Sequence, residues 1–117
     1  AGDTYCYDTK GNEDKKQRES EAADKLYSKL DCLGAELRKY WDEFEAAETN
    51  EAKYANALDR FQPLLMHFAF NSHSWQYHNI TKEAVLKRMA PIKIYSDEMY
   101  DFVLDYVESQ FKKEEMI

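Results

Sequence analysis

The chain has 117 residues and a mass of 13.9 kDa, the size of one folded domain, and its 44% hydrophobic and 33% charged residues exclude a disordered tail. No apolar run approaches the roughly 20 residues of a membrane span, and three Gly and two Pro are too few for a β-sandwich or barrel. These features together predict an all-α protein that does not bind membranes. A net charge of −7 repels phosphate backbones, so we also expect no binding to nucleic acid.

The N-terminal part of the chain predicts a loop followed by two helices. Residues 1–12 are rich in turn formers, and apolar residues then recur at helical spacing from about residue 13 to 30. The segment Asp31–Gly34 is expected to be a break. A second amphipathic helix should follow and end near Glu48, with Trp41 on its apolar face.

A third helix is predicted after Thr49 or Asn50, since either side chain can act as its N-cap. Pro63 lies inside this helix and should kink it or remove one backbone hydrogen bond. Its expected apolar stripe consists of Tyr54, Ala57, Leu58, Phe61, Leu65 and Phe68.

The C-terminal part predicts a long loop and two further helices. Residues 71–80 show no periodicity and are expected to form the longest loop. Thr81 then caps a short helix that Pro91 stops, and Ser96 caps the last helix. The last helix is expected to bury Met99, Phe102, Val103, Tyr106, Val107 and Phe111. Together the pattern predicts a bundle of about five helices without strands, forming a single domain over residues 1–117.

The two cysteines predict no disulfide and no zinc site. Cys6 and Cys32 form neither a CxxC pair nor a zinc-binding pattern, and the N-terminus resembles no signal peptide. We interpret them as reduced thiols of a cytoplasmic protein. The basic residues of the first helix alternate with acidic ones, which is typical of a solvated surface rather than a nucleic-acid site.

Few residues indicate a chemical function by spacing alone. No phosphate-binding glycine loop, nucleophile elbow or metalloprotease motif is present. The histidines His67, His73 and His78 could reach one metal ion, but packing and hydrogen-bonding roles are commoner for histidines beside aromatic residues. Asp59 lies beside the apolar stripe of the third helix and needs a partner there, most simply a cation in an ion pair.

Three parts of the sequence resemble the HD-domain metal-dependent phosphohydrolases. They are the opening AGDTY, the helix QRESEAADKL and the segment EAKYANALDRFQPLLMHFAFNSHSWQYHNITKEAVLKRMAPI. The closest branch is the one of the 5′-deoxynucleotidases and their small relatives, and the resemblance covers essentially the whole chain. It implies an all-α bundle in which two histidines and two aspartates bind a divalent metal ion. That metal, Mn, Co or Mg, activates water against a phosphate ester.

The resemblance assigns roles to four residues. Asp59 in ALDRFQ matches the last metal-binding aspartate of the family, and Asp3 in AGDTY matches a substrate-pocket residue of the nucleotidase branch. Trp75 and His78 match a loop of that branch that is not a metal-ligand segment. If Asp59 is such a ligand, we expect it to face the interior of the bundle.

The family's first metal histidine, its adjacent His-Asp pair and a nearby glutamate all lie upstream of AGDTY. The sequence is therefore expected to be a truncated HD domain that lacks the N-terminal helices and holds no cofactor of its own. One carboxylate binds a divalent ion weakly, because affinity comes from several ligands acting together.

Three functions remain open. We favour a truncated HD-domain-like helical protein of unassigned role, which is catalytically inactive alone. An alternative is a phosphohydrolase of nucleoside 5′-monophosphates that is completed by another chain or an upstream segment. Another alternative is a small-ligand or protein-binding module, for which a nucleotide could be the ligand.

The abundance of aromatic residues, 15% of the chain, predicts self-association. If upstream helices are missing, parts of the apolar stripes lose their cover, and exposed apolar patches usually mark interfaces. We therefore expect a homodimer, the commonest closed arrangement of one soluble chain.

Overall fold

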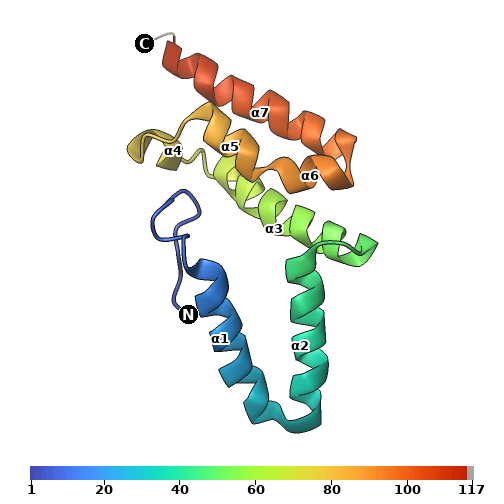
Figure 1. The fold of residues 1–117 in the computed structure, drawn as a ribbon. Coiled ribbons are helices and arrows are strands. Elements are labelled where there is room, and N and C mark those ends of the chain that lie inside the picture. Colours follow the sequence, from blue (N-terminus) through green and yellow to red (C-terminus); the bar gives the residue numbers. More distant parts are fainter. Residues whose placement is uncertain (116–117) are drawn as a thin grey trace. The chain divides into compact units, whose positions relative to one another are not determined.

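The computed structural model describes the backbone of residues 1–115 and the side chains of residues 1–112, and this part of the chain contains helices and no strand (Figure 1). The all-α prediction is confirmed. The helices in chain order are α1 (Lys15–Tyr27), the 3₁₀ helix η1 (Ser28–Leu30), α2 (Asp31–Ala46), α3 (Asn50–Ala69), α4 (Ser74–Tyr77), α5 (Lys82–Arg88), α6 (Ala90–Tyr95) and α7 (Asp97–Glu115). The five predicted helices correspond to α1, α2, α3, α5 and α7. The short α4 lies inside the predicted loop of residues 71–80, and the short α6 begins where Pro91 was expected to end a helix.

The chain divides into two compact units, which are described separately. The N-terminal unit comprises Ala1–Ala46 and contains the N-terminal loop, α1, η1 and α2. The C-terminal unit comprises Ala47–Ile117 and contains the remaining helices.

In the N-terminal unit, α1 and α2 form a helical hairpin through η1 (Figure 1). The predicted break at Asp31–Gly34 is wrong, because α2 begins at Asp31 and continues through Gly34. Asp31 has a φ of 50°, which turns the chain from η1 into α2. Gly34 is buried, and a Cβ atom at this position would lie 1.8 Å from the carbonyl oxygen of Tyr27. The glycine therefore allows the close approach of the turn rather than ending the helix.

Arg38 ties the two helices of this hairpin together. Its guanidinium forms an ion pair with Asp24 of α1 and another with Asp42 of α2, the latter at 3.0 Å. It also donates to the hydroxyl of Ser20 at 3.3 Å and lies 5.0 Å from the ring centre of Trp41. The hydrogen bonds to Asp42 and then to Asp24 raise the pKa of Arg38, so the guanidinium stays charged.

The predicted N-caps of the C-terminal unit are confirmed. Thr49 accepts a hydrogen bond from the backbone N–H of Ala52 at 3.1 Å and caps α3. Thr81 caps α5 in the same way, and Ser96 accepts from the N–H at the start of α7, each at 3.2 Å. These bonds satisfy amide groups that have no partner inside the helix.

The core of the C-terminal unit forms where α3 packs along α6 and α7 packs on α5 and α6. The largest side chains with almost no exposed surface are Leu64, Val85, Ile92, Val103 and Val107. On α3, the predicted stripe is wrong in part, because Tyr54, Leu58, Leu65 and Phe68 are exposed and Ala52, Ala57, Leu64 and His67 are buried. The helix carries apolar residues on several sides, so periodicity does not identify the buried face. On α7, Phe102 is exposed although we expected it inside.

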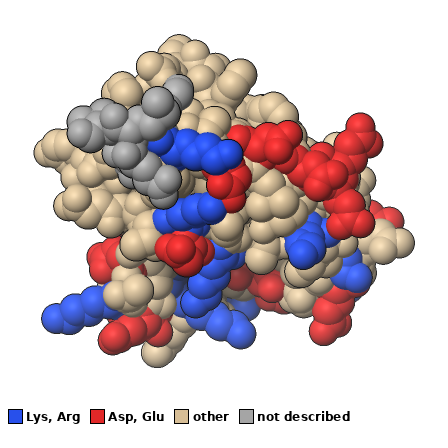
Figure 2. Space-filling view, turned by 90° about the horizontal axis from the view of Figure 1, so that it is seen from above, with Lys and Arg blue, Asp and Glu red and all other residues tan. Residues whose placement is uncertain are grey.

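Charged side chains lie on the outside of the described helices, among uncharged residues (Figure 2). Figure 2 shows acidic side chains gathered along one edge of the face that it draws, while acidic and basic side chains alternate elsewhere. Lys82 of α5 forms an ion pair with Glu108 of α7, and this pairing lowers the pKa of the Glu108 carboxyl group. Among the described residues, no helix has both the length and the apolar composition needed to cross a bilayer.

Candidate functional site

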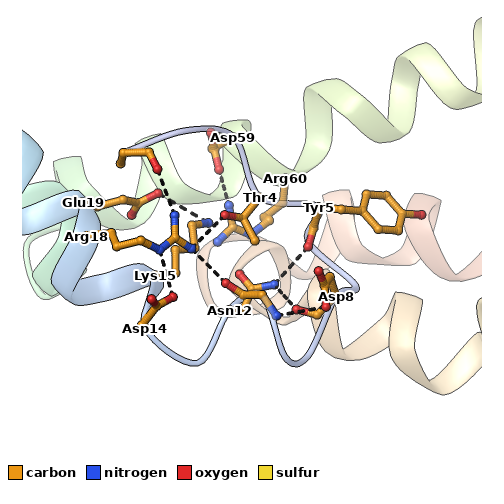
Figure 3. Close-up of polar contacts among 12 residues, drawn as sticks. Thr4, Tyr5, Asp8, Asn12, Asp14, Lys15, Arg18, Glu19, Asp59 and Arg60 are labelled. Carbon is orange, nitrogen blue, oxygen red and sulfur yellow. Dashed lines mark hydrogen bonds and ion pairs between the residues drawn. The ribbon is translucent and has the colours of Figure 1, made fainter.

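Asp59 lies on α3, ten residues after the capping Thr49, and its side chain is 51% exposed. The expected interior position is therefore wrong in this structure. The expected ion pair is confirmed, since the carboxylate pairs with the guanidinium of the adjacent Arg60 (Figure 3). Asn56, one turn earlier, donates to the carbonyl oxygen of Ala52 at 2.9 Å. An exposed ion pair of this kind is worth about 0–1 kcal/mol, so Asp59 is not required for folding.

Asp3 is exposed and lies in the N-terminal loop, which Arg18 of α1 holds in place (Figure 3). The Arg18 guanidinium donates to the backbone carbonyl oxygen of Ala1 at 3.0 Å and to the side-chain hydroxyl of Thr4 at 3.1 Å, so it binds residues on either side of Asp3. It also donates to the carbonyl oxygen of Gly11 at 2.9 Å and pairs with Asp14 at 2.8 Å. These contacts give the loop a defined path although it has few buried apolar side chains.

A second set of hydrogen bonds closes the turn of this loop. The Asp8 carboxylate accepts from the N–H of Gly11 at 2.9 Å, and the side-chain amide of Asn12 donates to the carbonyl oxygens of Tyr5 and Asp8. Such aspartate and asparagine contacts are typical of tight turns. A Cβ atom on Gly11 would lie 2.4 Å from Oδ2 of Asp8, so glycine suits this position.

Trp75 and His78, the loop residues that resemble the nucleotidase branch, differ in their environment. Trp75 is buried, with 5% of its surface exposed, while His78 is exposed at the end of α4. The Trp75 ring stacks on the imidazole of His67, with ring centres 3.9 Å apart and planes inclined by 20°. Trp75 thus has a packing role in this unit.

The three histidines do not form a metal site in the described part of the chain. His67 is buried and its Nδ1 lies 2.6 Å from the hydroxyl oxygen of Tyr106. Burial and, to a lesser degree, the nearby His73 lower the pKa of His67, so its imidazole is neutral at pH 7. Within residues 1–112, no three His, Cys, Asp or Glu side chains converge to hold a metal ion.

Local sequence patterns did not predict three features of the structure. Arg18 organises the N-terminal loop, and the only signal for it was the i, i+4 spacing from Asp14. The His67–Tyr106 pair spans 39 positions, and no local pattern indicates it. Gly34 was interpreted as a helix break because its neighbour across the hairpin is visible only in the fold.

The fold is all-α, and the two candidate carboxylates belong to the N-terminal loop (Asp3) and to α3 (Asp59). A family model described as "HD domain" matches residues 1–98, which include both Asp3 and Asp59, and the chain belongs to the HD-domain family. No curated protein and no solved structure matches the chain. Proteins of this family are generally metal-dependent, but the described side chains do not supply a full ligand set.

Proposed function

We propose that the 117-residue chain is an HD-domain helical protein that does not hydrolyse phosphate esters by itself. The observation that carries this proposal is that no three His, Cys, Asp or Glu side chains among the described residues converge on one point. A divalent metal ion is held by three or four ligands together, so a single carboxylate competes poorly with water. Without the metal ion, the attacking water is not activated at neutral pH.

Asp59 is the residue through which this chain would join a complete site. We place the chain in the 5′-deoxynucleotidase-like branch, with Asp59 as a metal-binding aspartate and Asp3 as a residue of the substrate pocket. Within this chain the Asp59 carboxylate is exposed rather than interior, so it is open to ligands from outside the chain, and this supports a second candidate function. In that case the chain is a nucleoside 5′-monophosphate phosphohydrolase whose remaining ligands come from another chain or from an upstream segment.

The isolated 117-residue chain is expected to release no phosphate from nucleoside 5′-monophosphates above the buffer rate, with Mn²⁺, Co²⁺ or Mg²⁺ added. The reason is the incomplete ligand set. Phosphate release is measured with the chain and with Asp59→Ala, which loses only an exposed ion pair and should fold normally. Metal-dependent release that disappears in Asp59→Ala would contradict the proposal.

The second candidate is tested by adding the missing ligands rather than by changing the assay. Where the gene encodes further residues before Ala1, the longer chain is assayed with the same metals and substrates. The second candidate predicts metal-dependent phosphate release that Asp59→Ala abolishes. Release that persists in Asp59→Ala would show that Asp59 does not take part in the reaction.

We also propose that the chain forms homodimers. Several large apolar side chains are exposed in the described part of the C-terminal unit, among them Phe70 at 73%, Tyr77 at 82% and Ile94 at 69%. Covering such groups favours association by the hydrophobic effect. Light scattering at micromolar concentration is expected to give twice 13.9 kDa, and a stable species of 13.9 kDa would contradict the proposal.

A further inference from the structure

His67 is a buried titratable group that the proposed function does not use. It lies near the C-terminal end of α3, with 8% of its surface exposed. Its Nδ1 lies 2.6 Å from the Tyr106 hydroxyl oxygen on α7. Its Nε2 is buried and has no hydrogen-bond partner among the described residues. One nitrogen of the ring is thus satisfied, and the other lacks any group that could stabilise an additional proton.

The same imidazole holds α4 in place through Trp75. Trp75 is the buried residue of this four-residue helix, and its ring stacks on His67 at 3.9 Å and on Phe111 of α7 at 6.0 Å. The carbonyl oxygen of His67 also accepts a hydrogen bond from the N–H of Ser72 at 3.0 Å, and the carbonyl oxygen of Trp75 accepts one from the N–H of Ile80 at 2.8 Å. The first bond and the Trp75 ring attach the segment Asn71–Ile80 to α3 and α7, while the second closes the turn within the segment.

Protonation of His67 is unfavourable in this arrangement. The titratable groups that act on it are Tyr106 from α7 and His73 from the segment before α4, while α4 itself contributes the uncharged Trp75. Burial raises the pKa of Tyr106, so this side chain provides no anion. Stacking of an imidazolium ion on Trp75 would gain about 2 kcal/mol, but an unpaired buried charge costs several kcal/mol. The desolvation cost is the larger of the two.

We propose that His67 is an acid-sensitive latch for the segment Asn71–Ile80. The neutral imidazole holds Trp75, and with it α4, against α7. When the segment opens, the imidazole reaches water and accepts a proton, which stabilises the open form. The proposal concerns a conformational change of the C-terminal unit and is independent of metal binding.

The stability of the closed segment depends on pH because the closed and open forms bind different numbers of protons. The pKa of His67 is lowered in the closed form and returns to its ordinary value of 6.5 in the open form. Below pH 6.5 the open form binds more protons, so the closed form is fully stable above this pH and loses stability as the pH falls toward the lowered pKa. In that window, the equilibrium constant for opening rises about tenfold per pH unit.

Hydrogen exchange resolved by residue tests the latch on the full 117-residue chain. The protection factors of the Ser72 and Ile80 amides, corrected for the intrinsic rate at each pH, are compared at pH 7.5 and 5.5. A fall of about tenfold is expected. Unchanged protection of both amides would overturn the proposal.

Two variants separate His67 from the other titratable groups. His73→Gln/His78→Gln leaves His67 as the only one of the chain's three histidines and should keep the fall in protection. His67→Phe/Tyr106→Phe retains an aromatic stack, removes both partners of the hydrogen bond, and should lose the pH dependence. A fall of the same size in the His67 variant, or its loss in the histidine control, would overturn the proposal.

A direct titration keeps the proposal testable if the His67 variant does not fold. The imidazole signals of the unmodified chain are followed by NMR between pH 8 and 5. We expect His67 to titrate below pH 6.5 while the segment is closed. Titration of His67 at or above pH 6.5, with Ile80 still protected, would show that the fold does not oppose its protonation.

Discussion

Gly34→Ala is expected to destabilise the N-terminal unit by about 2 kcal/mol, although alanine is the better helix former by about 1 kcal/mol. A Cβ atom at this position would lie 1.8 Å from the Tyr27 carbonyl oxygen and 2.9 Å from its carbon. These are backbone atoms, so no side-chain rotation relieves the overlap. The hairpin must therefore open or shift, and the cost of that movement exceeds the gain in helix propensity.

Residue-resolved hydrogen exchange measures this effect within one unit. The amides of α2 should lose protection in Gly34→Ala, while those of α7 in the C-terminal unit keep theirs. Ala35→Gly is the matched control. Ala35 is exposed on the same helix, so removing its methyl group changes helix propensity without changing a buried contact. Increased protection of α2 in Gly34→Ala would show that propensity outweighs the contact with Tyr27.

Leu64→Ala is expected to lower the free energy of unfolding of the C-terminal unit by about 2–5 kcal/mol. Leu64 is 1% exposed and lies on the face of α3 that enters the core. Shortening its side chain to that of alanine leaves a cavity in the core and reduces the apolar surface that folding buries. The neighbouring Leu65 is 38% exposed, so Leu65→Ala makes the same chemical change at a site where most of that cost is absent.

Urea unfolding followed by tryptophan fluorescence compares the two leucine variants. A Trp41→Phe background leaves Trp75, a buried residue of the C-terminal unit, as the reporter. The midpoint should fall much further for Leu64→Ala than for Leu65→Ala, with similar slopes. Equal shifts, or a larger shift for Leu65→Ala, would contradict the assignment of the buried face.

Local sequence signals predicted the helices well because their causes are local. Thr49, Thr81 and Ser96 cap helices as expected, since a hydroxyl oxygen can satisfy a free N–H group close to it in the chain. The prediction of five helices omitted only short elements. The four-residue α4 has too few residues to show periodicity, and the stack of Trp75 on His67 keeps it in place.

The candidate site was less predictable, because its properties depend on distant neighbours. The ion pair of Asp59 followed from its neighbour Arg60, whereas its exposure did not follow from the apolar residues around it. The roles of Asp3 and Asp59 in binding substrate and metal stay predictions. The clamp that Arg18 forms around the loop of Asp3 joins groups up to 17 positions apart, which sequence spacing does not reveal.

By itself, the sequence determined the helical class, the N-caps and the family resemblance, since each depends on residue type and short-range order. Only the tertiary structure decided which side of α3 is buried, that Gly34 is a contact point and not a break, and that His67 pairs with Tyr106. The physical reason is that apolar residues occur on several sides of α3, so burial depends on which neighbours the fold supplies. The effect of a missing Cβ atom or a buried imidazole likewise depends on the groups that the fold places against it.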